Sequence, residues 1–331
     1  MQEKDLVIIG AGPTGLFATF CACLRGIDSL TLESLDLPGG QMRELYPEKF
    51  VYDIAGIPKK NAISIANDLY TQAQELGGNI AFKSHVTDIV QRDDSRFDIE
   101  IDGTKQYIAK AILVCTGIGL FTPNKLNVPG ESEYADKGVY YTVKSLDLFK
   151  DKKVAIIGGG DAAFDWAEEI LPFASAVCIV EKNAEIRAAE NTVKTVTADK
   201  KTSVFVNSIT KEVSGDGSKV TSVVLHKTDT NQDVNVPCDA IIIAIGHKTQ
   251  PNAFKSVKLE NDGRYVKVDE KYSTNVKGIF AAGDIANLSF EPKFALLAVD
   301  FAEAYEAINW IKQYVSPQAS LSGGHSSNLK L

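Results

Sequence analysis

One glycine-rich turn pattern occurs twice in this chain and constrains the fold more than any other feature. The apolar run at 6–9 leads into Gly-Ala-Gly-Pro-Thr-Gly at 10–15, followed by helix-favouring residues to about 25. A second apolar run at 154–157 leads into Gly-Gly-Gly-Asp-Ala-Ala at 158–163 and a helix-favouring stretch through 170. Each copy predicts a strand, a tight turn and a helix in that order.

An acidic residue follows each turn at the same distance. Short strands are predicted at 29–32 and 177–180, and they end in Glu33 and Glu181, each 18 positions beyond the third small residue of its turn. In a dinucleotide-binding unit the small residues let the backbone and the helix N-terminus approach a pyrophosphate, and the acid accepts hydrogen bonds from a ribose. The candidate contacts are Gly10, Gly12, Gly15 and Glu33 for one dinucleotide, and Gly158, Gly160, Ala163 and Glu181 for the other. Two dinucleotides in one chain predict electron transfer between them.

Two further apolar runs, 111–117 and 240–246, each end in a glycine and bracket the second turn. They indicate where the chain leaves and re-enters its first domain. With 331 residues the chain is long enough for two domains of ordinary size. We therefore expect a discontinuous domain of about 1–117 and 247–331, with a second domain of about 118–246 inserted into it.

Charge and cysteine usage narrow the function classes. The formal net charge of −8 argues against a nucleic-acid binder, which needs a basic face. The N-terminus runs directly into the first motif and no apolar run reaches the ~18 residues of a membrane span, so we expect a cytoplasmic protein. The cysteines are odd in number and lack C-x-x-C or metal-ligand spacing, which predicts reduced thiols and no metal site: Cys21, Cys23, Cys115, Cys178 and Cys238.

The chain resembles the two-dinucleotide-binding flavoproteins whose small members include thioredoxin reductase. The turn at 10–15 with Glu33 resembles their FAD turn, and Gly-Ile-Phe-Ala-Ala-Gly-Asp at 278–284 resembles their second flavin motif. The resemblance implies an α/β fold of two Rossmann-like domains, with FAD in the first and a nicotinamide cofactor in the second. It places Asp284 at the ribityl and pyrophosphate region of FAD. By itself Asp284 also fits a helix N-cap after a glycine.

A redox-active cysteine pair is absent where thioredoxin reductases carry it. The stretch 138–145 contains no cysteine, and Cys21 and Cys23 lie two apart in a predicted helix, where they point away from each other. Because disulfide reduction needs an attacking and a resolving thiolate, we exclude it. The segments 39–41, 45–49, 52–56 and 324–327 instead resemble the thioredoxin-reductase-like ferredoxin:NADP reductases.

That second resemblance implies particular flavin contacts. Tyr46 would stack on one face of the isoalloxazine, and His325, in a C-terminal tail of about 315–331, would cover the other face and act as a gate for the nicotinamide. Ser326 would lie near N5, and a homodimer is implied. The full set of implied FAD contacts is Thr14, Glu33, Gln41, Tyr46, Val86, Phe121, Asp284 and Ser326.

The implied activity is electron transfer from NAD(P)H through FAD to a ferredoxin or flavodoxin, in a direction that stays open. Two alternatives share the flavin motifs: an NAD(P)H oxidase or diaphorase using oxygen, quinone or dyes, and a non-catalytic redox-sensing flavoprotein. Ferredoxins are commonly acidic, so a local basic patch is expected, with candidates Lys49, Lys59, Lys60 and Lys248.

The residues expected to set the preference between NADH and NADPH depart from the family pattern. NADPH-using relatives carry an H-R-R type run after the second strand of this domain, whereas this chain has Glu181-Lys182-Asn183, with Arg187 further on. A carboxylate favours a ribose 2′-hydroxyl and repels a 2′-phosphate, while Lys182 and Arg187 partly restore the positive charge. Our hypothesis is that NADH serves as well as NADPH or better.

Overall fold

The computed structural model describes residues 1–45, 47, 49–117, 119–143, 145–250, 254–288 and 293–323, without the side chains of 120–122 and 247–250. The chain divides into two compact units, one of 1–121 with 249–331 and one of 122–248. The chain passes from one unit to the other at 121–122 and at 248–249, close to Gly117 and Gly246, where the sequence predicted the domain boundaries. Strands β9 (Leu120–Pro123) and β18 (His247–Gln250) pair with each other there.

The first unit is built on a seven-stranded sheet with the order β5-β2-β1-β8-β7-β6, and β20 also pairs with β8. The neighbours of β1 are parallel to it, whereas β6 and β7 form an antiparallel hairpin. The elements of this unit are β1 (Gln2–Ile9), α1 (Pro13–Leu24), β2 (Ser29–Leu32), α2 (Gln41–Glu44), β3 (Phe50–Val51), β4 (Lys60–Asn61), α3 (Ala62–Glu75), β5 (Ile80–Ala81), β6 (Val86–Gln91), β7 (Phe97–Ile101), β8 (Thr104–Val114), β19 (Val266–Lys267), β20 (Ile279–Ala281), β21 (Ala286–Asn287) and α6 (Leu297–Val315).

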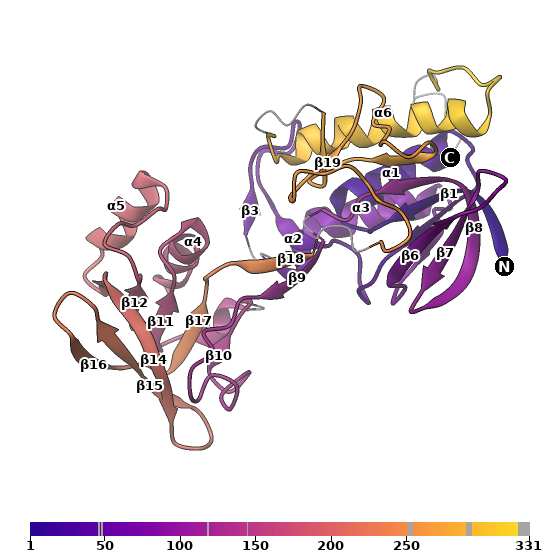
Figure 1. Ribbon diagram of the computed structural model, residues 1–331. Coiled ribbons are helices and arrows are strands. Elements are labelled where there is room, and N and C mark those ends of the chain that lie inside the picture. Colours follow the sequence, from indigo (N-terminus) through magenta and orange to yellow (C-terminus); the bar gives the residue numbers. More distant parts are fainter. Residues whose placement is uncertain are drawn as a thin grey trace. The chain divides into compact units, whose positions relative to one another are not determined.

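The central strands of this sheet are buried on both faces. The last four residues of β1 and all four of β2 are buried, which explains why they read as continuous apolar runs rather than alternating ones. Helices α1 and α6 pack against each other over this core (Figure 1). The arrangement leaves the carboxyl ends of β1, β2 and β8 at one edge, where the glycine turn begins.

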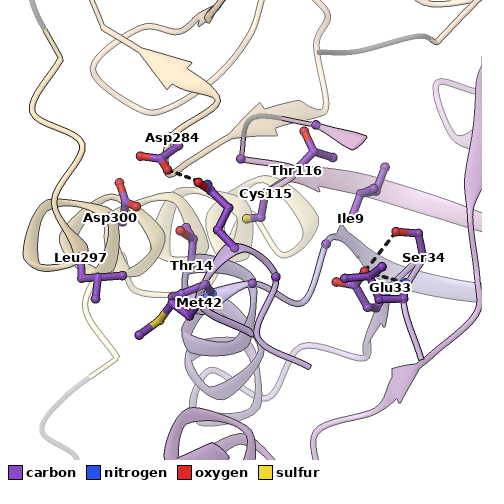
Figure 2. A pocket seen from close by; sticks show the side chains of 18 of the residues that line it. Ile9, Thr14, Glu33, Ser34, Met42, Cys115, Thr116, Asp284, Leu297 and Asp300 are labelled. Atoms are coloured by element: carbon purple, nitrogen blue, oxygen red, sulfur yellow. Dashed lines mark hydrogen bonds between the residues drawn. The ribbon is translucent and has the colours of Figure 1, made fainter. Parts of the chain in front are cut away.

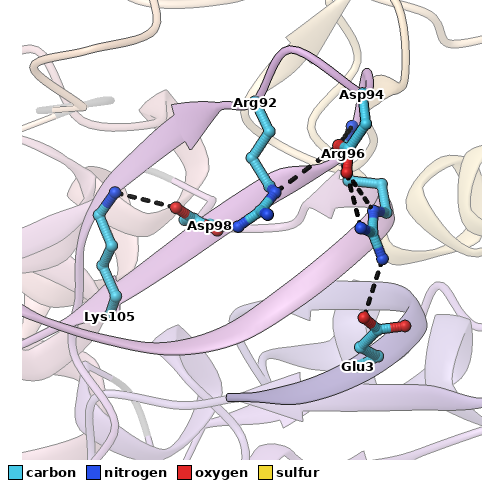
Figure 3. A network of polar contacts seen from close by, with 6 residues as sticks. All are labelled: Glu3, Arg92, Asp94, Arg96, Asp98 and Lys105. Atoms are coloured by element: carbon cyan, nitrogen blue, oxygen red, sulfur yellow. Dashed lines mark hydrogen bonds and ion pairs between the residues drawn. The ribbon is translucent and has the colours of Figure 1, made fainter.

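A network of charged side chains covers the β6–β7 hairpin (Figure 3). Asp98 of β7 is buried and accepts hydrogen bonds from Arg92 Nη1 at 2.7 Å and Lys105 Nζ at 2.9 Å. Arg96 donates to Glu3 of β1 at 2.9 Å. Because a buried carboxylate is stable only when paired, these contacts hold the hairpin to its neighbours in the sheet.

The second unit contains a five-stranded parallel sheet, β10-β17-β11-β12-β13, and a three-stranded antiparallel sheet, β14-β15-β16. Alternate residues of β11 enter two cores: Val154 and Ile156 pack with α4, and Ala155 and Ile157 pack with residues of β15. The elements are β10 (Val139–Tyr140), η1 (Leu146–Phe149), β11 (Lys153–Ile157), α4 (Asp161–Ile170), β12 (Ala176–Val180), α5 (Glu190–Ala198), β13 (Thr202–Phe205), β14 (Ser208–Gly215), β15 (Val220–Lys227), β16 (Gln232–Pro237) and β17 (Ala240–Ile243).

The same strand order occurs in both units, and in each the predicted succession of strand, glycine turn and helix is confirmed. The run β5-β2-β1-β8 of the first unit corresponds to β13-β12-β11-β17 of the second, and a glycine turn follows the central strand, β1 or β11. The strands predicted at 29–32 and 177–180 are confirmed as β2 and part of β12. The fold is therefore α/β with two Rossmann-like units. Within the described residues, no helix has the length and apolarity to cross a bilayer.

Candidate functional site

The first glycine turn joins β1 to α1, and its three glycines differ in what surrounds them. Gly10 has a φ of +102°, and a Cβ there would lie 2.6 Å from the carbonyl oxygen of Cys115. A Cβ on Gly15 would lie 1.9 Å from the carbonyl oxygen of Gly10, so only glycine lets α1 close onto the turn. At Gly12 a Cβ would approach no described atom closer than 4.0 Å. Gly12 is thus the position at which a ligand can approach the backbone.

Glu33, directly after β2, contacts the backbone of this turn. Its Oε2 accepts a hydrogen bond from the backbone N–H of Ala11 at 2.7 Å, and its Oε1 accepts one from the N–H of Leu35 at 2.9 Å. The side chain is buried. Ser34 Oγ also donates to Oε1, at 3.1 Å. A carboxylate has about four acceptor positions, so Glu33 keeps capacity for about one hydroxyl of a ribose.

A cavity of about 830 Å³ opens at this turn (Figure 2). That volume lies within the range of sites for small molecules and cofactors, about 300–1,000 Å³. Seven of the predicted FAD contacts line it: Gly10, Gly12, Thr14, Glu33, Gln41, Val86 and Asp284. Gly15 lies behind the turn and does not line it. Tyr46, His325, Ser326 and the side chain of Phe121 lie outside the described residues.

Asp284 stands at the opposite wall, on the loop after β20. Its Oδ2 accepts a hydrogen bond from Gln41 Nε2 at 3.0 Å, which joins two segments 243 positions apart. The interpretation of Asp284 as a helix N-cap is wrong, because β21 follows it and α6 begins only at Leu297. The carboxylate faces the cavity instead of a helix end (Figure 2).

Sequence reasoning missed two polar groups in the cavity wall. Thr116 Oγ1 and Asp300 Oδ1 are buried and have no hydrogen-bond partner among the described residues. Buried polar atoms are nearly always paired, so these two suit a wall that a polar ligand completes. The available signal for Asp300 was an acidic residue in the first turn of α6, three positions before Glu303, on an otherwise apolar face.

The second glycine turn, between β11 and α4, repeats the first. Gly158 has a φ of +139°, and a Cβ there would lie 2.3 Å from the carbonyl oxygen of Ala244. At Gly160 no described atom lies within 4 Å of a Cβ position, as at Gly12. The third position is Ala163, whose side chain is buried against the sheet.

Glu181 occupies the place that Glu33 has in the first unit. It is buried, and a Cβ on Gly159 would lie 2.5 Å from its Oε2. Its Oε1 accepts hydrogen bonds from Asn183, from the backbone N–H at 2.8 Å and from Nδ2 at 2.6 Å. The carboxylate is therefore held against the turn. The backbone N–H of Arg187 donates to the carbonyl of Gly159 at 2.9 Å, which brings its segment to the same place.

The predicted basic residues of this site differ from Glu181 in burial. Both Lys182 and Arg187 are exposed. They are thus available to a ligand from the solvent side, while the buried carboxylate faces the turn. Among the described residues no cluster of His, Cys, Asp and Glu suits a metal ion.

The thiols are free, and all are buried except Cys23, which is half-buried. Burial raises the pKa of Cys21 to about 12, with a smaller contribution from Cys23, and burial likewise raises the pKa of Cys238 to about 12. A thiol with such a pKa is not a nucleophile near neutral pH.

Comparisons with known proteins agree with this geometry. Residues 4–307 match the family model described as pyridine nucleotide-disulphide oxidoreductase. A ferredoxin–NADP reductase of Picrophilus torridus is 48% identical, with 100% of both chains covered, and ferredoxin–NADP reductase 2 of Sulfolobus acidocaldarius is 41% identical, covering 99% of this chain and 98% of that one. Thioredoxin reductase of Lactococcus lactis superposes with a TM-score of 0.80 at 26% identity, covering 95% of this chain and 99% of that one. That of T. acidophilum gives 0.79 at 28%, with the same coverage.

Proposed function

The chain belongs to the pyridine nucleotide-disulphide oxidoreductase family, and we propose that it is an FAD-containing ferredoxin–NAD(P)+ reductase. The observation that carries the proposal is the pair of glycine turns, each with a buried acid against it, in a chain that matches ferredoxin–NADP reductases over its whole length. FAD and NAD(P)H are the cofactors of this reaction. When bound, FAD accepts a hydride and releases single electrons, which is the chemistry that joins a nicotinamide to a one-electron carrier.

The cavity of the first unit fits FAD in its lining residues, and its volume of about 830 Å³ lies in the range of cofactor sites. Its glycine turn admits a pyrophosphate at Gly12, and the N-terminus of α1 faces that position with its backbone N–H groups. Glu33 accepts a hydrogen bond from the adenosine ribose, and Asp284, held by Gln41, accepts hydrogen bonds from the ribityl hydroxyls. Thr14 and Val86 complete the wall.

The remaining FAD contacts rest on the sequence resemblance. We assign Tyr46 and Phe121 to the flavin ring, because a tyrosine or phenylalanine gains stacking area on a flat aromatic body. His325 and Ser326 are assigned to the tail that covers and gates the flavin. No side chain is assigned as an acid or base, since hydride transfer needs position and electrostatics rather than a proton relay.

The second unit holds the nicotinamide cofactor. Gly158, Gly160 and Ala163 let the pyrophosphate approach the N-terminus of α4, and Glu181 accepts hydrogen bonds from the ribose. Lys182 and Arg187 supply positive charge at the rim of the same ribose. The carboxylate cannot move away easily, because Asn183 holds it with two hydrogen bonds. NADH is therefore used at least as well as NADPH.

Two features distinguish the proposed activity from other flavoprotein activities. The cysteines distinguish it from disulfide reduction, and the electron acceptor distinguishes it from an oxidase or a diaphorase. Disulfide reduction requires two reactive cysteines, and the five thiols of this chain include no C-x-x-C pair. An oxidase or diaphorase would share the flavin site but not the need for a protein acceptor. The homodimer and the cytoplasmic location stay predictions from the sequence, and flavodoxin is an alternative acceptor.

The test of this proposal is an anaerobic titration of the purified protein. We expect a yellow protein whose flavin, released by heat, is FAD, and whose absorbance near 450 nm bleaches on addition of NADH or NADPH. A protein that binds no flavin would overturn the proposal. A bound flavin that neither nicotinamide bleaches would support the non-catalytic sensor.

A further inference from the structure

Asp300 places an additional acidic group in the wall of the FAD cavity. It lies in the first turn of α6, is 5% exposed, and lines the same cavity as Thr14 and Asp284 (Figure 2). Neither the glycine turns nor the ribose-binding acids require it. A buried acid costs stability unless it is paired, so its presence at this point calls for a function.

The charged groups around Asp300 leave it without a cation of its own. The negative charges of Asp284 and Glu303 disfavour ionisation of Asp300, and the positive charge of Lys293 favours it. Lys293, however, lies 2.9 Å from both carboxylate oxygens of Glu303 and 2.7 Å from the carbonyl oxygen of Gly283. Its donors are therefore directed to those groups.

The other titratable neighbour is Cys115, which follows β8. Burial raises the pKa of its thiol well above the usual range, with smaller contributions from Asp300 and Glu303, so it is uncharged. The hydroxyl of Thr14 hydrogen-bonds with the Asp300 carboxyl. Burial, and after it the charge of Asp284, raises the pKa of Asp300 to about 7. A substantial fraction of the Asp300 carboxyls is therefore protonated near pH 7 before FAD binds.

A neutral carboxylic acid differs from a carboxylate because it can donate a hydrogen bond. Oδ1 of Asp300 is buried and makes no hydrogen bond within the described part of the chain. The chain that joins flavin to adenine carries hydroxyls, which both donate and accept, and pyrophosphate oxygens, which only accept and are anionic. A carboxylate can bind the hydroxyls, but it would be repelled by the pyrophosphate, whereas a neutral acid would donate a hydrogen bond to it.

We propose that Asp300 binds FAD as a neutral carboxylic acid, donating a hydrogen bond to a pyrophosphate oxygen, so that the protein holds FAD more tightly in acid than in alkali. This inference rests on the proposed function, since it concerns the same cavity. It adds a binding residue and a pH dependence that the glycine motifs do not predict.

The sign of the pH dependence follows from the protonation state that binds. Because FAD selects the neutral form, bound FAD raises the pKa of Asp300 further above its usual value. Affinity is then full below about pH 7 and falls as the pH rises through the pKa of the flavin-free protein. For a pKa near 7, the dissociation constant rises about tenfold between pH 6 and pH 8.

The experiment measures release of FAD from the diluted holoenzyme by flavin fluorescence at pH 6, 7 and 8. Wild type should show the tenfold rise. Asp300→Asn keeps a neutral donor, so it should hold FAD at pH 8 as it does at pH 6, within about twofold. Asp300→Ala loses the donor and should bind FAD more weakly than wild type at pH 6, again without the pH dependence. Glu306→Gln is the matched control, because Glu306 is an exposed acid of the same helix. It should reproduce the wild-type curve.

Two results would overturn the inference while leaving the proposed function intact. One is wild-type affinity that is constant between pH 6 and pH 8, and the other is an Asp300→Asn variant with the wild-type pH dependence. Thermal melts of the variants at each pH separate a folding defect from a loss of FAD affinity. A wild-type protein that binds no FAD at any pH would instead refute the proposed function itself.

Discussion

Lys293 and Glu303 form an ion pair that is almost completely buried, with 4% and 9% of the two side chains exposed and Nζ 2.9 Å from both carboxylate oxygens. The pair also binds both ends of one glycine: Lys293 donates to the carbonyl of Gly283, and Glu303 accepts from its N–H at 2.8 Å. Gly283 directly precedes Asp284. The pair is thus a clamp on the loop that presents Asp284 to the cavity.

Replacing Glu303 by Gln should destabilise the protein strongly. The amide keeps the shape of the side chain but leaves the Lys293 charge buried and unpaired, which costs about 3–5 kcal/mol. We expect a lower midpoint of urea unfolding and weaker retention of FAD. As a control, Lys211→Gln removes one partner of an exposed pair, Lys211 with Asp233, and should have little effect. A Glu303→Gln protein as stable as that control would contradict the clamp.

The second glycine turn offers a matched pair of variants. Gly158→Ala should unfold at a lower temperature, because its φ of +139° and the Ala244 carbonyl 2.3 Å away exclude a side chain. Gly160→Ala should melt as wild type does, since no described atom lies within 4 Å of the new methyl. It should nevertheless raise the KM for NAD(P)H about tenfold, because the methyl occupies the approach of the pyrophosphate. An unchanged KM in Gly160→Ala would rule out this nucleotide site.

Glu181 should set the choice between nicotinamides. In wild type we expect kcat/KM for NADH to equal or exceed that for NADPH. Glu181→Gln removes the charge, and we expect the ratio to shift toward NADPH by about tenfold, or about 1.4 kcal/mol. Steady-state kinetics with both cofactors check this. A wild-type preference for NADPH of a hundredfold or more would contradict the assignment of Glu181 as the residue that favours NADH.

Two of the lysines suggested for docking a ferredoxin lie at or near the cavity: Lys49 is half-buried and lines it, and Lys59 is the more exposed of the two. It is exposed near the cavity, with Nζ 4.1 Å from the ring centre of Phe50 and 5.6 Å from that of Tyr52. Lys60, in contrast, is paired with Asp68, and the side chain of Lys248 lies outside the described residues. Lys59→Glu should weaken reduction of an acidic ferredoxin and spare reduction of a small dye.

The control for Lys59→Glu is Lys271→Glu, which reverses another exposed lysine that lies over an aromatic ring, here Trp310 at 4.9 Å. It does not line the cavity. We expect it to leave both acceptors unaffected. Equal losses with ferredoxin and dye in Lys59→Glu would refute the docking role.

The thiols should be inert in the native protein. With pKa values of about 12 for Cys21 and Cys238, roughly one molecule in ten thousand carries each thiolate at pH 8. Iodoacetamide should therefore leave NAD(P)H oxidation unchanged, with half-buried Cys23 labelled first. The unfolded protein should label at all five cysteines. Inactivation that parallels labelling would point back to a thiol mechanism.

The two turns could be predicted because their signals are local. A strand, three small residues and an acid 18 positions later lie within one short segment, so Gly12, Glu33, Gly160 and Glu181 were accessible from the sequence alone. The antiparallel sheet β14-β15-β16 was not predicted, although the Asp-Gly pair at 216–217, between β14 and β15, is a local hairpin signal. The pairing of Lys293 with Glu303 across Gly283 was missed for a different reason. It depends on contacts between the loop that carries Gly283 and helix α6, and no residue spacing in the sequence predicts those contacts.

Asp300 illustrates a second limit of the sequence. An acid within an apolar helix is equally consistent with an exposed position, and only the structure shows it buried beside Asp284. Conversely, the sequence resemblance names Tyr46, His325 and Ser326, which lie outside the described residues. For these three residues the assignment stays a prediction.

The most direct measurement of the central claim is stopped-flow double mixing. The anaerobic protein is first reduced by NADH or NADPH and then mixed with either oxidised ferredoxin or air-saturated buffer, while flavin absorbance is recorded. The account predicts reoxidation by ferredoxin that is much faster than reoxidation by oxygen. Reoxidation by oxygen or dyes alone, with ferredoxin without effect, would contradict it and identify the protein as an oxidase or diaphorase.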